Sequence, residues 1–127
     1  MKIGIRRVEN FNNRLFVEFE CDYGAGQGLW LSNPPTVGDT YEVEIDCEDE
    51  LQVGQNVHLS DRNQYLITFI ESMTKLTAKI EDVYEDGAAA IRFGGAIMVA
   101  QFVGDAPSKE SWVDITTSHL ALNDISP

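Results

Sequence analysis

Hydrophobic and polar residues alternate along several short stretches of the chain, and the clearest run lies between residues 40 and 50. Every second residue from Tyr41 to Cys47 is apolar, and acidic residues occupy the positions between them. A period of two is typical of a strand that buries one face and exposes the other. This stretch predicts a strand whose exposed face carries the carboxylates of Glu42, Glu44, Asp46 and Glu48.

Similar patterns, separated by turn residues, predict other short strands. These are expected over residues 2–9, 14–22, 56–59, 64–71 and 112–116. The segment Asn10–Asn13 separates the first two, and asparagine tolerates the left-handed backbone of tight turns. These two strands should therefore form a hairpin. The second is expected to expose the carboxylates of Glu18, Glu20 and Asp22.

A meander of three strands is predicted between residues 75 and 103. Leu76, Ala78 and Ile80 alternate with polar residues that should face solvent. Asp86-Gly87 is a strong hairpin signal, because glycine accepts the positive φ of a tight turn. After a second turn at residues 94–95, the nearly continuous apolar run from 96 to 103 predicts a strand buried on both faces.

The segment Tyr23–Trp30 carries three glycines between two aromatic residues. A dinucleotide-binding loop requires the spacing G-x-G-x-x-G before a helix. Here the spacing is G-x-G-x-G, and Asn33-Pro34-Pro35 cannot open a helix. The segment is therefore predicted to be a mobile loop of a barrel, with Trp30 either in the core or on a contact surface.

Short strands with regular turn signals, and no long amphipathic helix, predict an all-β fold. With 127 residues and 43% hydrophobic residues, the chain can bury one real core. We expect a single domain over residues 1–127, with the architecture of a small OB-like barrel of about five to seven strands and little helix.

The net charge of −12 restricts the class of partner. Residues 15–50 contain ten carboxylates and no Lys or Arg. Nucleic-acid binding depends on basic side chains that neutralise phosphates, and anionic membranes also attract basic segments. The sequence therefore predicts neither a nucleic-acid nor a membrane partner, whereas a basic protein partner would be attracted by electrostatic steering.

The chain is expected to be soluble and cytoplasmic. The first six residues lack the apolar core of a signal peptide, and no apolar run approaches the roughly 20 residues that cross a bilayer. Two cysteines, Cys21 and Cys47, are too few for a disulfide framework. They are interpreted as reduced thiols on strands, and whether they pair is left open, as is the oligomeric state.

No motif for catalysis or metal binding stands out. A G-x-S-x-G sequence is absent, and uniformly solvated carboxylates lack the unlike environments that acid–base catalysis requires. The two cysteines, His58 and His119 have no zinc-site spacing. The acidic run after residue 45 lacks the glycine of a calcium loop. The chain is therefore interpreted as a non-enzymatic protein without a cofactor or a metal.

The functional hypothesis depends on the two predicted acidic strands. If the strands over residues 14–22 and 40–47 are neighbours, seven carboxylates share one face, which could mimic the polyanionic backbone of nucleic acid. Aromatic residues often anchor protein interfaces. The predicted partner-binding residues are Glu18, Glu20, Asp22, Tyr23, Trp30, Glu42, Glu44, Asp46 and Glu48. The alternatives are a merely solvated face, or a barrel that binds a small ligand at residues 24–30 or scaffolds an assembly.

Two segments carry a resemblance to a known group of proteins. One is Gly38–Asp46 with Asp49-Glu50-Leu51 after it, and the other is the hairpin Ile80–Gly87 with Ile91-Arg92-Phe93. Both resemble small acidic bacterial β-barrel proteins of OB-like architecture, over roughly residues 38–125. Several of these look like immunity proteins of polymorphic-toxin or contact-dependent inhibition systems. The resemblance implies an inhibitor that neutralises a toxin, such as a nuclease, by occluding its basic active-site cleft.

Overall fold

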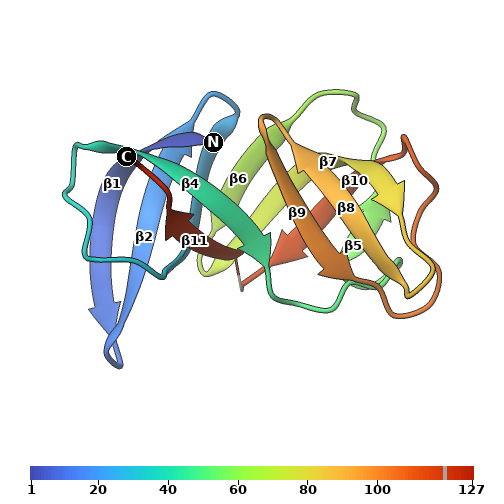
Figure 1. The fold of residues 1–127 in the computed structure, drawn as a ribbon, viewed down its shortest axis with the longest axis horizontal. Coiled ribbons are helices and arrows are strands. Elements are labelled where there is room, and N and C mark those ends of the chain that lie inside the picture. Colours follow the sequence, from blue (N-terminus) through green and yellow to red (C-terminus); the bar gives the residue numbers. More distant parts are fainter. Residues whose placement is uncertain (119) are drawn as a thin grey trace.

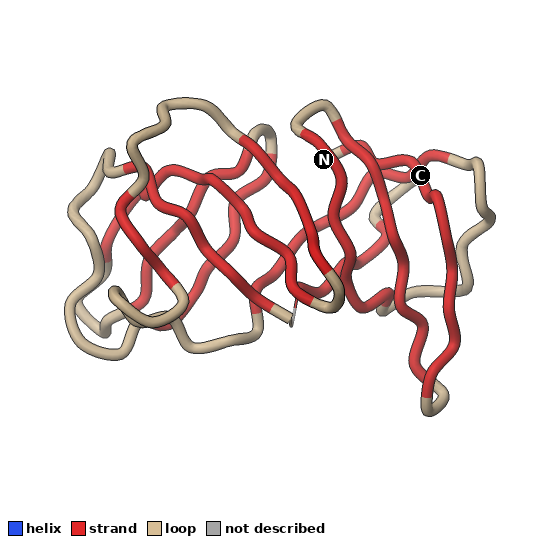
Figure 2. The backbone as a smooth tube through the Cα atoms, turned by 180° about the vertical axis from the view of Figure 1, so that it is seen from behind, coloured by secondary structure: helices blue, strands red, loops and turns tan. Residues whose placement is uncertain are grey.

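The computed structural model describes residues 1–118 and 120–127, and this part of the chain forms eleven strands and no helix (Figures 1 and 2). The strands are β1 (Lys2–Phe11), β2 (Arg14–Cys21), β3 (Gly24–Trp30), β4 (Thr40–Cys47), β5 (Val57–Leu59), β6 (Leu66–Ile70), β7 (Met73–Val83), β8 (Ala88–Phe93), β9 (Ala96–Gln101), β10 (Trp112–Thr117) and β11 (Leu120–Asp124). His119, considered above as a metal ligand, lies outside the described residues. The described residues contain no helix long and apolar enough to cross a membrane.

Five strands close into a barrel in the order β11-β4-β1-β2-β3. Strand β11 completes the ring, because it pairs antiparallel with β4 and parallel with β3. Closure removes the open edges of the sheet. The barrel interior is filled by the side chains of alternate residues, which include Ile3, Ile5, Val17, Phe19, Val43, Ile45 and Leu122. The predicted all-β class and the small OB-like barrel are confirmed, and the barrel has the lower of the expected strand numbers.

The other six strands extend the sheet beyond β3 (Figure 1). Strand β3 meets β6 at the pair Gly24 and Ile67, and the row continues through β7 and β10 to β5. Strand β7 also pairs with β8, which pairs with β9. Two isolated bridges, Leu51 with Phe102 and Val53 with Val57, link the ends of this second group. The buried side chains of both groups form one continuous core.

The predicted hairpins and their turn chemistry are confirmed. Asn12 and Asn13, between β1 and β2, have φ values of 54° and 62°. These values match the turn type whose twist suits a two-residue hairpin loop. Gly87, between β7 and β8, has a φ of 88°, and the Ala88 amide donates a hydrogen bond to the Asp86 carboxylate. The meander over residues 75–103 is therefore present as β7, β8 and β9.

The glycine segment was wrongly predicted to be a mobile loop, because it forms β3. Its alternate glycines face the barrel interior, where larger residues would not fit. A Cβ atom on Gly26 would lie 2.6 Å from Ile67 Cδ1, and one on Gly28 would lie 2.8 Å from the Leu120 carbonyl oxygen. These glycines make room for packing and do not serve flexibility. Trp30 ends the strand in the core, with 4% of its surface exposed.

Strand β9 was wrongly predicted to be buried on both faces. Ala96, Met98 and Ala100 are buried, but Ile97 and Val99 are 49% and 57% exposed. The outward face of β9 is therefore apolar and open to solvent.

Thr77 of β7 was wrongly predicted to face solvent. It is buried, and its hydroxyl donates a hydrogen bond to Asp114.

An ion pair between β7 and β8 leads to a pH-dependent prediction. The Arg92 guanidinium lies 3.0 and 3.2 Å from the two carboxylate oxygens of Glu81. The hydrogen bond from Arg92 lowers the pKa of Glu81 below its ordinary value of 4.5. A carboxylate whose pKa is lower in the folded state than in the unfolded state stabilises the fold at pH values above its ordinary pKa. This stabilisation is lost as the pH falls through the pKa of the folded state.

Replacing Arg92 by glutamine should therefore destabilise the fold near neutral pH and much less near pH ~3. The check is urea unfolding of the wild type and Arg92→Gln at both pH values. An equal difference at the two pH values would show that the pair does not act through the charge of Glu81.

Candidate protein-binding surface

The acidic row of β4 is exposed as predicted. Tyr41, Val43, Ile45 and Cys47 turn toward the core, and Glu42, Glu44 and Asp46 turn toward solvent. Glu48 continues the row just after the strand and is also exposed. Successive outward side chains of a strand lie about 7 Å apart. The row therefore presents like charges at regular spacing along the outer face of the closed barrel.

Most of this row has no Lys or Arg partner in the part of the chain that the structure describes. Within the described residues, no Lys or Arg side chain forms an ion pair with Glu44, Asp46 or Glu48, while Glu42 lies 3.5 Å from the amino group of Met1. The neighbouring strand β11 places Asn123 opposite Glu44 and does not add a positive charge. Glu44, Asp46 and Glu48 are therefore exposed negative charges that no described Lys or Arg neutralises.

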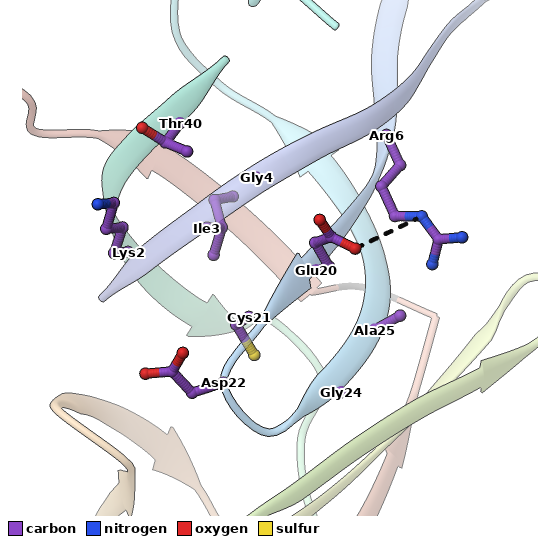
Figure 3. Close-up of a pocket in the computed structure, with 10 residues that line it drawn as sticks. All are labelled: Lys2, Ile3, Gly4, Arg6, Glu20, Cys21, Asp22, Gly24, Ala25 and Thr40. Atoms are coloured by element: carbon purple, nitrogen blue, oxygen red, sulfur yellow. Dashed lines mark ion pairs between the residues drawn. The ribbon is translucent and has the colours of Figure 1, made fainter. Parts of the chain in front are cut away.

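The carboxylates of β2 do not join this row, because β1 lies between β2 and β4 in the sheet. The condition for a shared face of seven carboxylates is therefore not met. Strand β1 also brings arginines to the β2 acids. Glu18 lies 3.8 Å from Arg7, and Glu20 lies 3.9 Å from Arg6 (Figure 3). This side of the barrel carries mixed charge and suits a basic partner less well.

A hollow of about 600 Å³ opens on this mixed-charge side (Figure 3). Lys2, Arg6, Glu20 and Asp22 line it, together with the thiol of Cys21. Burial is the main cause that raises the pKa of the Cys21 thiol above its ordinary value of 9.0. A thiol with a raised pKa stays protonated at neutral pH and is a weak nucleophile. The hollow therefore combines charges of both signs, of which Arg6 and Glu20 form an ion pair, with a thiol that is not activated.

The predicted aromatic anchors lie away from the β4 row. The Trp30 ring packs at 5.3 Å from Tyr41 inside the barrel, so it is not available for a contact surface. Tyr23 is half-buried and lies 5.5 Å from Tyr65 and 5.3 Å from Phe93. The position of Tyr23 is thus set by the second group of strands, which sequence reasoning did not connect to it.

Exposed apolar residues of β9, and not the predicted aromatic residues, lie beside the β4 row. Strands β4 and β9 lie side by side (Figure 1) and border a hollow of about 260 Å³. Glu44 and Asp46 line this hollow, as do Ile97 of β9 and Ile125, which is 49% exposed. We define the β4–β9 surface as Glu44, Asp46, Glu48, Ile97, Val99 and Ile125.

Sequence reasoning missed the apolar part of this surface. Residues 96, 98 and 100 are small or flexible, while Ile97 and Val99 are β-branched. That alternation was a possible signal of a strand with two different faces. It was hidden because both faces of β9 are apolar, and hydrophobicity alone does not tell a buried face from an exposed one.

A second hollow, of about 500 Å³, lies at the other group of strands. The aromatic hollow is defined by Tyr23, Tyr65, Trp112, Lys79 and Asn63. The Tyr65 and Trp112 rings are 5.0 Å apart, and the Lys79 ammonium lies 5.9 Å from the Trp112 ring centre. Lys79 also lies 2.7 Å from Glu110. This hollow combines half-buried aromatic rings with polar groups, which is typical of small-ligand sites.

Comparisons with known proteins found no relative. A scan against protein-family models and searches of the curated proteins and of the solved structures gave no match. Within residues 1–118 and 120–127, no three His, Cys, Asp or Glu side chains gather so as to hold a metal ion.

Proposed function

We propose that this chain is a non-enzymatic binding module that takes a basic protein partner on its β4–β9 surface. The observation that carries the proposal is a group of three carboxylates, Glu44, Asp46 and Glu48, which form no ion pair with a Lys or Arg of the described residues and lie beside exposed apolar side chains of β9. Complementary charge steers association and selects partners, while apolar contact at the centre of an interface supplies affinity. Acidic and apolar groups meet at one hollow here, which supports a protein partner.

A narrower function follows from the acidic surface together with the resemblance in the sequence. We propose that the protein inhibits a bacterial toxin, such as a nuclease, by placing the β4 carboxylates in the basic cleft of the enzyme. In this role the chain would act as an immunity protein in the cytoplasm. The carboxylates would contact the Lys and Arg side chains that otherwise hold the nucleic acid.

The test is a comparison of three immobilised proteins exposed to lysate of the source organism. They are the wild type, the β4 variant (Glu44→Lys, Asp46→Lys, Glu48→Lys) and the β2 variant (Glu18→Lys, Glu20→Lys, Asp22→Lys). We expect the wild type and the β2 variant to retain the same basic protein, which rising salt then releases. The β4 variant should not retain it.

Equal retention on all three columns, or no retained basic protein, would contradict the proposal. The inhibitor role is tested by activity of the recovered protein. If that protein is a nuclease, the wild type should block its cleavage of DNA or RNA at a one-to-one ratio, and the β4 variant should not.

The aromatic hollow favours a second candidate function, the binding of a small ligand. Tyr65 and Trp112 lie at its wall beside Lys79. If this function is correct, we expect a neutral compound to copurify with the wild type and with the β4 variant, but not with Tyr65→Ala. Residues 24–30, where the sequence predicts a ligand-binding loop, form β3 instead and do not provide such a loop.

A further inference from the structure

We propose that the aromatic hollow binds a saccharide, whose rings pack on the aromatic side chains while its hydroxyl groups bond to the polar residues beside them. This inference rests on the second candidate function and names the chemical class of its ligand. It is independent of the basic partner proposed for the β4–β9 surface, because the two surfaces share no residue. The two proposals can therefore fail separately.

Three aromatic rings form one wall of the hollow. Tyr23 precedes β3, Tyr65 precedes β6 and Trp112 begins β10, so the rings come from three distant parts of the chain. The Tyr65 ring contacts both of the others, because it lies 5.5 Å from Tyr23 and 5.0 Å from Trp112. All three residues are half-buried and line the hollow. The hollow thus presents a row of aromatic surface to a ligand.

Neighbouring residues of the core hold this wall in place. The buried Phe93 ring lies 5.3 Å from Tyr23 and 6.0 Å from Tyr65. Gly94 lies so close to the Tyr23 ring that a Cβ atom there would be 2.3 Å from Tyr23 Cε2. Side chains that are already fixed lose little conformational freedom when a ligand binds, so they favour affinity. The wall is therefore formed before the ligand arrives.

Polar side chains line the hollow beside the aromatic wall. Asp22, at the turn between β2 and β3, supplies a carboxylate, and Asn63 and Gln64 supply two amides. All three residues are exposed. A carboxylate accepts hydrogen bonds, and an amide both donates and accepts them. The hydroxyl groups of a saccharide also donate and accept, so these side chains match its polar edge.

The charges around the hollow favour a neutral ligand. The Lys79 ammonium lies 2.7 Å from the Glu110 carboxylate, so its charge is already paired. It also lies 5.9 Å from the Trp112 ring centre, where it would repel a cationic ligand packed on that ring. Asp22 forms no ion pair with a Lys or Arg of the described residues, and it would repel an anionic ligand.

A saccharide meets all of these conditions. Its hydroxyl groups carry no charge, and the C–H groups on the faces of its rings are apolar. Such C–H groups pack well on an aromatic ring, because the face of the ring is negative. The volume of about 500 Å³ is also in the size range of small-ligand pockets.

The inference is tested by NMR titration of isotope-labelled wild type with maltotriose, cellotriose and triacetylchitotriose. These trisaccharides differ in the linkage between their rings and in the N-acetyl group. We expect at least one to bind with a Kd of about 1 mM or lower. The amide signals of Asn63, Gln64, Tyr65 and Trp112 should change most. Affinity should differ by less than about twofold between ~50 and ~500 mM salt, because a neutral ligand forms no ion pair.

Two substitutions of Tyr65 provide the matched comparison. Tyr65→Ala removes the ring that contacts both of its neighbours, and should weaken binding of that trisaccharide at least about tenfold. Tyr65→Phe keeps the ring, and should weaken it by less than about threefold. Circular dichroism and thermal unfolding establish whether each variant is folded.

Asp22→Ala covers the case in which Tyr65→Ala does not fold. Asp22 is exposed, and its removal breaks no ion pair with a described Lys or Arg. The substitution removes a charged acceptor and should weaken trisaccharide binding at least about fivefold. The β4 variant is the control, and it should bind the trisaccharide with the affinity of the wild type.

Three results would overturn the inference: no trisaccharide binding at about 10 mM, signal changes centred outside the aromatic hollow, or wild-type affinity of folded Tyr65→Ala or of Asp22→Ala. Indole, a neutral apolar ring compound, distinguishes this failure from failure of the second candidate function. If indole binds in the hollow and the trisaccharides do not, the hollow is a ligand site but the saccharide class is wrong. Retention of the basic partner tests the β4–β9 surface separately.

Discussion

The β4 variant is expected to associate with a basic partner about 100-fold more slowly than the wild type at low salt. Three exposed negative charges become positive, so the surface that attracted the partner repels it. Glu44, Asp46 and Glu48 have no ion-pair partner among the described residues, so these substitutions do not break an internal pair. The measurement is the association rate of the recovered partner at several salt concentrations.

The β2 variant is the control for this prediction. It changes the same number of charges, but Glu18 and Glu20 already lie next to Arg7 and Arg6. Its association rate should fall by less than about tenfold, because the changed charges are not next to the binding surface. If both variants slow association equally, the effect comes from net charge, and the β4–β9 surface is not the site.

The largest effect on stability is expected for Gly24→Ala. Gly24 has a φ of 134°, and a Cβ atom there would lie 2.1 Å from the Ile67 carbonyl oxygen. Gly24 and Ile67 are also the pair through which β3 meets β6. The substitution combines backbone strain with a clash at this junction and should destabilise the fold by at least about 3 kcal/mol. Urea unfolding measures the change.

Substitutions at two other glycines distinguish the effect of backbone strain from the effect of the clash with Ile67. Gly38 has a φ of 92° but no atom within 4 Å of an added Cβ. Gly38→Ala should therefore cost about 1–2 kcal/mol from backbone strain alone. Gly95 has neither feature, and Gly95→Ala should change stability by less than about 0.5 kcal/mol. Equal losses for Gly24→Ala and Gly38→Ala would show that the contact with Ile67 is unimportant.

Sequence patterns predicted the local elements well where the two faces of a strand differ chemically. The β4 row is the best example, because acidic and apolar residues alternate without interruption and burial separates them. The turn at Asn12 and Asn13 was also predictable, since both residues adopt the left-handed backbone that asparagine tolerates. Such features depend on residues close together in sequence.

The remaining features depend on contacts between distant residues. The glycines of β3 resemble a loop in composition, and the shortest contacts that exclude side chains from Gly26 and Gly28 come from Ile67 and Leu120, far along the chain. The order of strands follows from the same long-range pairing. It places β1 between the two acidic strands, so the predicted common face is divided.

The candidate site was therefore predicted only in part. Glu44, Asp46 and Glu48 were recognised from their spacing, and the structure places them together on an exposed row. Ile97 and Val99 were assigned to the core, because an apolar run carries no signal of which face solvent reaches. They are exposed because they lie on the face of β9 that points away from the core, whereas Ala96, Met98 and Ala100 lie on the buried face.

The most direct test of the central claim is an NMR titration of isotope-labelled protein with the recovered basic partner. If the partner binds the β4–β9 surface, the amide signals that change most will be those of Glu44, Asp46, Ile97 and Val99, and added salt will reverse the changes. Changes centred on Tyr65 and Trp112, or on the β2 carboxylates, would contradict the account.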